Sequence, residues 1–315
     1  MRSGILNVYK EPGFTSFDVV AKLRGILHIR KIGHTGTLDP AARGVLPVCI
    51  GRATKAVDLM ANWTKTYIAD MQLGIRTDSQ DMTGQILERN PVSVSEDEIQ
   101  REVASFFGPQ DQIPPMYSAR KVGGKRLYHY ARQGIELERR ASHIVIYDIQ
   151  ILSMELPHVI MEVTCSKGTY IRTLCSDIGD ALGCGASMAA LERIRVGDFD
   201  SKNALRLDQI QEAAAAGRLE DILYPVDAVF ADLPALKLPK GLTKAGKNGA
   251  PIAEKTEGIT CLYEGEKQSR TGSDWRKAGL GLAFRVYLSD GAFLGIYVRC
   301  EEGLRLKNFF YEERL

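Results

Sequence analysis

One segment of the 315-residue chain, GHTGTLDPAARGVLP from Gly33 to Pro47, combines side chains that could do chemistry. Its first two glycines let the backbone approach a ligand closely, and Pro40 fixes the chain directly after Asp39. A carboxylate held on so rigid a turn, beside His34 and Arg43, is arranged to take part in a reaction. The alternative is an ordinary Asp-Pro turn, in which the Asp39 side chain caps a nearby amide.

Several common kinds of site are excluded by residue spacing. The glycines of this segment match neither a P-loop, which needs a following Gly-Lys-Ser or Gly-Lys-Thr, nor the dinucleotide-binding fingerprint. The five histidines have no metal-ligand spacing, and none of the six cysteines forms a Cys-x-x-Cys pair. We therefore expect reduced, mostly buried cysteines and no metal site.

A second segment indicates a nucleic-acid partner. From Tyr117 to Arg140 the chain carries seven Lys or Arg against two Glu, together with three tyrosines. Cations interleaved with aromatic rings suit a phosphate backbone with stacked bases. The alternative is a solvated surface helix anchored by a few tyrosines, and the overall net charge of +2 does not decide between the two.

Four segments together resemble the TruB-type pseudouridine synthases. Gly33 to Pro47 is similar to the family's signature around its catalytic aspartate, and Lys65-Thr66-Tyr67 to its Lys-x-Tyr motif. Ser166 to Thr173 (SKGTYIRT) is similar to its arginine motif, and Ile113 to Lys121 (IPPMYSARK) to its RNA-contacting stretch. The resemblance runs from about residue 4 to 199 and continues more weakly to the C-terminus.

The resemblance implies a role for each matching position. Asp39 would be the nucleophile, Arg172 would pair with it, and Tyr67 would pack against the target base and take part in proton transfer at its C5. The implied substrate-binding residues are His34, Tyr170, Leu191 and, as a nucleotide contact, Asp81; from the basic segment we add Lys121, Lys125 and Arg126.

The implied activity is the conversion of a uridine in the TΨC loop of tRNA, at position 55, to pseudouridine. The reaction needs no redox change and no energy source, so no metal or organic cofactor is implied. Two alternatives remain: a non-catalytic protein that binds or folds tRNA, and a synthase that depends on a guide RNA. We favour the stand-alone enzyme, because all three catalytic residues are present and the chain starts almost directly at its first predicted strand.

The elements that must position these residues can be predicted from their patterns. Alternation and apolar runs predict strands at 5–9, 45–50, 66–73, 145–154 and 159–165. Helical spacing and capping residues predict helices at 17–29, 52–61, from Ser95 to near Gly108, 170–182 and 207–217. Because strands and helices do not alternate strictly, we expect an α+β fold with a mixed, largely antiparallel sheet.

The composition of the chain changes after Pro225, where prolines and glycines become frequent. Short strands are predicted at 284–288, 293–298 and 304–310. We expect a catalytic domain over residues 1–235 and a small β domain over 236–315, which resembles the PUA-like extension of the family. No apolar run is long enough to cross a membrane and no secretory leader is recognisable, so we expect a cytoplasmic protein, as a monomer.

Overall fold

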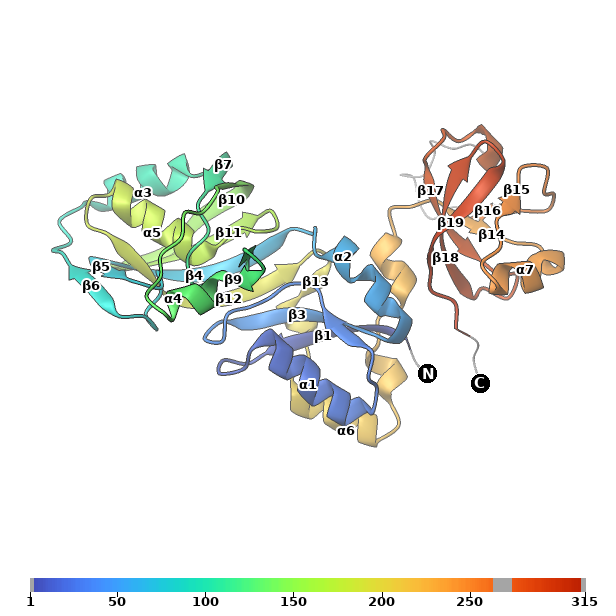
Figure 1. Ribbon diagram of the computed structural model, residues 1–315, viewed down its shortest axis with the longest axis horizontal. Helices are drawn as coiled ribbons and strands as arrows, with labels where there is room; N and C mark the ends of the chain where they lie inside the picture. The colour runs from blue at the N-terminus through green and yellow to red at the C-terminus, as the bar shows by residue number, and fades with distance from the viewer. Residues whose placement is uncertain (1–2, 263–273, 313–315) are drawn as a thin grey trace.

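The computed structural model describes residues 3–262 and 274–312, which include a large sheet and a smaller one (Figure 1). Two further sheets have two strands each: β5 (Ile75–Thr77) with β6 (Ile86–Arg89), and β8 (Lys121–Val122) with β9 (Lys125–Arg126). In the described part of the chain the large sheet has nine strands, in the order β1-β3-β12-β4-β11-β10-β7, with β2 paired to β3 and β13 to β12. Its strands are β1 (Gly4–Lys10), β2 (Ile32–His34), β3 (Arg43–Ile50), β4 (Lys65–Leu73), β7 (Gly108–Gln112), β10 (Ser142–Glu155), β11 (His158–Cys165), β12 (Ala186–Val196) and β13 (Phe199–Asp200).

Two groups of helices cover different halves of this sheet (Figure 1). One group packs its apolar side chains on β1 and β3, and the other packs on β4, β10 and β11. The first group comprises α1 (Ser16–Leu27) and α6 (Leu207–Ala215); the second comprises α3 (Glu96–Ser105) and α5 (Ile171–Ala181).

Strand β3 shows how the sequence builds both faces of the sheet. Its side chains alternate, so Leu46, Val48 and Ile50 face α1 and α6, while Val45 and Cys49 point to the opposite face. That opposite face is covered by η1 (Gly51–Ala56), α2 (Val57–Met60) and η4 (Val226–Phe230). Both faces of β3 are therefore buried, which explains its nearly continuous apolar run.

The two halves of the sheet meet at a short seam. Strands β3 and β12 are parallel and pair only through Glu192 with Arg43 and Arg193 with Gly44, whereas the other neighbouring strands of this sheet are antiparallel. Gly44 has φ +110°, and a Cβ there would lie 2.2 Å from the Arg193 carbonyl oxygen. The seam therefore requires glycine at this position.

The smaller sheet uses strands from Ala235 onwards, in the order β15-β19-β18-β17-β14-β16. They are β14 (Ala235–Lys237), β15 (Ile252–Ala253), β16 (Thr260–Leu262), β17 (Ala283–Tyr287), β18 (Phe293–Cys300) and β19 (Gly303–Phe309), with α7 (Thr243–Lys247) beside them. Ile296 and Phe310 join Val226 and Phe230 in one apolar cluster, so this sheet packs against the larger part. In Figure 1 it forms the lobe drawn in orange and red.

The predicted α+β class and the largely antiparallel sheet are confirmed. Ser95 caps α3 through a capping box, as the sequence predicts, and Thr15 caps α1 in the same way. The region predicted as a helix at 52–61 is instead a 3₁₀ turn followed by one α-helical turn. No helix among the described residues is long and apolar enough to cross a membrane. The six cysteines are free, four of them buried.

Strand β12, at the centre of the large sheet, is absent from the elements predicted above. Its sequence, ASMAALERIRV, lacks a period of two because the pairing with β4 shifts register twice, after Met188 and after Arg193. Each shift changes which face the following side chains occupy. Strand β7 was also missed, because it is a short polar strand at the sheet edge.

Candidate active site

Asp39 lies in the loop between β2 and β3, and buried polar groups fix this loop. The Ser16 hydroxyl accepts a hydrogen bond from the Leu38 amide (2.9 Å), and the Asp39 carbonyl accepts one from Ala42 (3.1 Å). The Lys10 ammonium, which is almost fully buried, donates to the Pro40 carbonyl (3.2 Å) and to two other carbonyls. The carboxylate is therefore presented on a backbone that has little freedom to move.

Arg172 connects Asp39 to a second carboxylate. Its Nη2 lies 3.5 Å from Asp39 Oδ2, and its Nη1 lies 3.5 Å from Asp81 Oδ2. Nη2 also donates to the Tyr117 carbonyl at 2.6 Å, which orients the guanidinium. The Arg172 side chain is 6% exposed and the Asp39 side chain 36%, so the arginine forms the floor of the site while the aspartate remains accessible.

Asp81 is held by its own turn. Its Oδ1 accepts hydrogen bonds from Ser79 Oγ (2.7 Å), from Thr83 Oγ1 (2.5 Å) and from the Thr83 amide (2.9 Å), which leaves Oδ2 to face Arg172. The backbone of the turn bridges to Met188 of β12. This turn thus carries a fixed carboxylate, whose Oδ2 faces Arg172.

The electrostatics of Asp39 combine opposing influences. Burial raises the pKa of the Asp39 carboxyl, Arg172 lowers it, Asp81 raises it and Lys10 lowers it, with a net rise above the ordinary value. A carboxylate that must stay ionised in a partly dry site needs a neighbouring cation, and Arg172 is the cation that lowers this pKa most. Burial in turn lowers the pKa of Lys10 to about 8.

Tyr67 lies on β4, where its side chain is buried and forms part of the core beside Leu38. It pairs across the sheet with Val163 on one side and Arg193 on the other. Burial raises the pKa of the Tyr67 hydroxyl, and the adjacent Arg193 guanidinium opposes this rise. Leu191, also on β12, pairs with Ala69 of β4 and packs at the edge of the same core.

Several predicted site residues and their neighbours keep polar atoms or rings that a substrate could use. Tyr170 directly precedes α5, its backbone N–H and carbonyl bind the Gln112 side-chain amide (2.8 and 3.0 Å), and its ring lies 5.9 Å from the Arg172 guanidinium. Within the described residues, the buried atoms His34 Nδ1, Ser118 Oγ and Arg172 Nε have no hydrogen-bond partner. Buried polar atoms are normally satisfied, so these atoms are candidates for contacts with a substrate.

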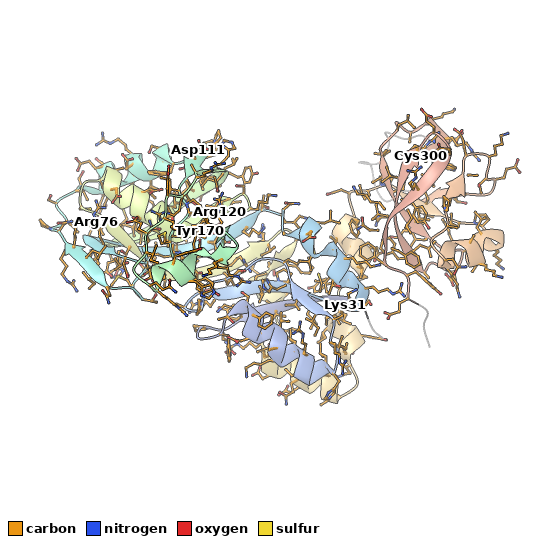
Figure 2. All side chains as sticks on the ribbon, in the orientation of Figure 1. Lys31, Arg76, Asp111, Arg120, Tyr170 and Cys300 are labelled. Carbon is orange, nitrogen blue, oxygen red and sulfur yellow. The ribbon has the colours of Figure 1, made fainter. Side chains whose placement is uncertain are left out.

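The basic segment forms a hairpin and a short helix tied to the same region. Lys125 and Arg126 are exposed on β9 (Lys125–Arg126), which pairs with β8 (Lys121–Val122). The amides of Leu127 and Tyr128 donate to the carbonyls of Arg120 and Ser118, next to the residue that binds Arg172. The structure describes the backbone of Lys121 but not its side chain. Figure 2 labels Arg120 and Tyr170 in this part of the molecule.

A second basic region lies where the two sheets meet. An open pocket of about 700 Å³ is lined by Arg52 from η1 and by residues near α7 and the end of β19. Lys55 donates to the Phe309 carbonyl (2.8 Å), and Arg52 lies 5.5 Å from the Phe309 ring. The other lining residues are Lys240, Gly241, Thr243, Lys244, Lys247, Asn248, Phe309 and Tyr311. We call this the C-terminal basic pocket.

The structure brings together Asp39, Arg172 and Asp81 through ion pairs, and Tyr67 lies near enough to Asp39 for the charge to act on its pKa. Sequence reasoning missed the buried cations that surround them: Lys10, Lys65 and Arg193. Lys and Arg are usually exposed, so burial is not expected of them; Lys65 entered only as the first residue of the Lys-x-Tyr motif, and Lys10 and Arg193 belong to none of the motifs described above. Among the described residues, no group of three or more His, Cys, Asp or Glu side chains could hold a metal ion.

Two family profiles match consecutive parts of the chain, which together cover residues 24–231. Residues 24–171 match the profile "TruB family pseudouridylate synthase (N terminal domain)", and residues 172–231 match "tRNA pseudouridylate synthase B C-terminal domain". A tRNA pseudouridine synthase B of Clostridium novyi is 44% identical over 97% of this chain and 98% of that protein. One of Alkaliphilus oremlandii is 47% identical over 79% of this chain and 83% of that protein.

Two solved structures with the same architecture are chains of larger complexes. A chain in an H/ACA RNP bound to a substrate RNA containing 2′-deoxyuridine superposes with a TM-score of 0.71 at 25% identity, over 98% of this chain and 85% of that one. A chain in a Cbf5-Nop10-Gar1 complex gives the same TM-score at 27% identity, with the same coverage. The likeness therefore includes the C-terminal sheet as well as the large one.

Proposed function

The chain belongs to the TruB family of pseudouridylate synthases, and we propose that its substrate is the uridine at position 55, in the TΨC loop of tRNA. It is a tRNA pseudouridine synthase, an isomerase, as its relatives of 40–47% identity are named. The proposal for the site rests on one observation: the Arg172 guanidinium forms ion pairs with both the accessible Asp39 and the buried Asp81.

The isomerisation breaks the N1–C1′ bond of the uridine, turns the uracil, and joins C5 to C1′. A base inside a folded RNA arm must first leave its stack, at a cost of a few kcal/mol. Packing against an aromatic ring such as Tyr67 recovers about 1–3 kcal/mol. The detached uracil must also remain in place, which a closed pocket with a covalent or tightly held intermediate achieves.

We propose that Asp39 is the nucleophile and that Arg172 keeps it ionised. Three routes use the same carboxylate: attack on C6 of the ring, attack on C1′ of the sugar, or assistance to a glycal intermediate. Tyr67 would pack against the base and take part in proton transfer at C5. His34, Tyr170, Leu191 and Asp81 would hold the flipped nucleotide around them.

We further propose that two basic regions bind the RNA. The hairpin with Lys121, Lys125 and Arg126 would contact the TΨC arm, since it is tied to the backbone beside Arg172. The C-terminal basic pocket would contact a more distant part of the same tRNA, towards its acceptor end. In this division residues 1–235 are the catalytic domain and residues 236–315 a PUA-like domain.

The closing test is tritium release from tRNA that carries C5-tritiated uridine, with the wild type and Asp39→Asn side by side and no other RNA present. We expect about one tritium per tRNA from the wild type and none from Asp39→Asn, which should still bind tRNA. Release only after a guide RNA is added would place the protein in a particle like the H/ACA RNP. Tight binding without release would favour a tRNA-binding or tRNA-folding protein, and either result would contradict the proposal.

Three expectations complete the proposal. The enzyme acts without a guide RNA, because its named relatives are tRNA pseudouridine synthases. It acts as a monomer, since one arm of one tRNA needs one site. It acts in the cytoplasm, where tRNA is processed. The tritium assay tests the first, and sedimentation of the protein with and without tRNA tests the second.

A further inference from the structure

The Arg193 side chain occupies the seam between the two halves of the large sheet. β12 and β3 pair there through only two residue pairs, one of which is Arg193 with Gly44. The Arg193 residue is 1% exposed. Burying a guanidinium costs several kcal/mol unless its donors are satisfied, so its hydrogen bonds indicate what it does.

Those hydrogen bonds hold the loop that carries Asp39. Nη2 donates to the Gly36 carbonyl at 3.1 Å, and Nη1 reaches the Thr37 carbonyl at 3.5 Å. Nε donates to the Val45 carbonyl at 2.7 Å, in the strand that follows the loop. One planar group thus binds the backbone on both sides of Asp39.

The same residue lies beside Tyr67. Arg193 lies directly opposite Tyr67 in the pairing of β12 with β4, and its charge lowers the pKa of the Tyr67 hydroxyl against the effect of burial. The loop of Asp39 and the strand of Tyr67 belong to different halves of the sheet, and Arg193 contacts both. The rigid fork of arginine suits this task better than the flexible stem of lysine.

We propose that Arg193 is a positioning residue, which sets the Asp39 loop and the Tyr67 hydroxyl in the one arrangement that the isomerisation requires. The inference rests on the proposed roles of Asp39 and Tyr67. It assigns Arg193 no contact with the RNA, so its loss slows the reaction of bound tRNA and leaves affinity nearly unchanged. Misplacement of a reacting group by about 1 Å can cost roughly a hundredfold in rate.

The test uses Arg193→Lys, which keeps the charge, and Arg193→Met, which removes it. Arg195→Lys and Arg195→Met are matched controls, since Arg195 is exposed on the same strand. The single-turnover rate of tritium release is measured with enzyme in excess, the dissociation constant by filter binding, and the folded fraction by urea unfolding. We expect Arg193→Met to react about a hundredfold more slowly with a dissociation constant within about twofold of the wild type. Arg193→Lys should recover part of that rate, and the controls should match the wild type.

A second measurement probes the geometry directly. The protein is prepared with 3-fluorotyrosine, and the ¹⁹F resonance of residue 67 is assigned by its absence in Tyr67→Phe. Arg193→Lys should shift this resonance while the other tyrosine resonances stay in place. An unshifted resonance, rates equal to the wild type, or an equal loss of rate and affinity would overturn the proposal.

Failure of both variants to fold would also overturn it, because Arg193 would then serve the fold alone. An inactive wild-type protein would instead count against the proposed function and not against the positioning role.

Discussion

The site around Asp39 and the C-terminal basic pocket use charge in opposite ways. At Asp39, the cations Lys10, Arg172 and Arg193 are buried and bound to backbone carbonyls or carboxylates. In the C-terminal basic pocket, Lys240 and Lys244 are exposed side chains on short helical turns. The first arrangement fixes groups in space, whereas the second supplies positive potential on adaptable stems.

The difference indicates a division of labour between chemistry and affinity. A reacting carboxylate gains from being held within a fraction of an ångström, and a phosphate backbone gains from many weak, salt-sensitive contacts. We therefore expect single changes near Asp39 to act on rate with little effect of salt. Changes in the basic regions should act on affinity, additively and with a strong dependence on salt.

The largest effect is expected from Arg172→Met. It removes the cation that lowers the pKa of Asp39, so that pKa should rise further and the acidic limb of the rate profile should move to higher pH. We expect the single-turnover rate at neutral pH to fall by about 10²–10³-fold, the usual loss for one electrostatic stabiliser. Single-turnover rates from pH 5 to 8 test this, with the exposed Arg218→Met as control; an acidic limb that stays in place would contradict the role of Arg172.

The seam that supports this site should be nearly as sensitive. Gly44→Ala places a Cβ 2.2 Å from the Arg193 carbonyl at φ +110°, so β3 and β12 must separate. We expect a loss of about 2–4 kcal/mol in the free energy of unfolding, from strain and overpacking together. Gly13→Ala is the matched control, because it has φ +89° and no atom within 4 Å of the added Cβ. Equal losses in the two variants, measured by urea unfolding, would show that the seam adds nothing to the backbone strain.

Gly44 and Arg193 also mark the limit of what the sequence predicts. The Asp39 loop, the strand of Tyr67 and the helix that begins after Tyr170 all follow from local motifs, capping residues and periodicity. The seam is a contact between residues 149 positions apart, and the two register shifts of β12 remove the alternation that would identify it as a strand.

Buried cations escape sequence reasoning for a related reason. Lys10 and Arg193 look like surface residues in composition, and only the folded backbone shows which carbonyls they bind. The partnership of Arg172 with Asp39 followed from the family resemblance, but the ion pair with Asp81 needed the structure. Motifs therefore predict which groups react, and the fold shows what holds them.

The C-terminal basic pocket should contribute to affinity alone. Reversing two charges, in the double variant Lys240→Glu and Lys244→Glu, should raise the dissociation constant for whole tRNA by about tenfold and reduce the salt slope by about 2. An isolated TΨC stem-loop should bind and react as with the wild type. The control is Lys255→Glu with Lys277→Glu, exposed lysines of the same region outside the pocket. Equal weakening for the stem-loop and whole tRNA would place the pocket's contact on the TΨC arm.

Changes in the hairpin, unlike those in the C-terminal basic pocket, should weaken binding of the isolated stem-loop as well as of whole tRNA. Lys125→Ala with Arg126→Ala should weaken whole tRNA and the isolated stem-loop alike, by about three- to tenfold, and flatten both salt slopes. Both side chains are exposed, so folding should be unaffected. Filter binding of the two RNAs from 50 to 300 mM salt measures this. Unchanged slopes for the stem-loop would place the RNA elsewhere, and the two basic regions would no longer be distinguished by the part of tRNA they contact.

The smallest expected effect is a change in thermal stability on Asp39→Asn, a variant that should lose activity. Because the pKa of Asp39 is raised in the folded protein, the folded state binds a proton more readily than the unfolded chain, and the ionised form costs stability. Asp39→Asn removes this cost, so its Tm at neutral pH should exceed that of the wild type by about 1–2 °C. The gap should close as the pH falls through the raised pKa towards the ordinary value of 3.8, where both side chains are neutral. The exposed Asp232→Asn should show no such gap. A wild type more stable than Asp39→Asn at neutral pH would mean that the Arg172 pair outweighs the burial of the carboxylate, and the site would then stabilise the fold that positions it.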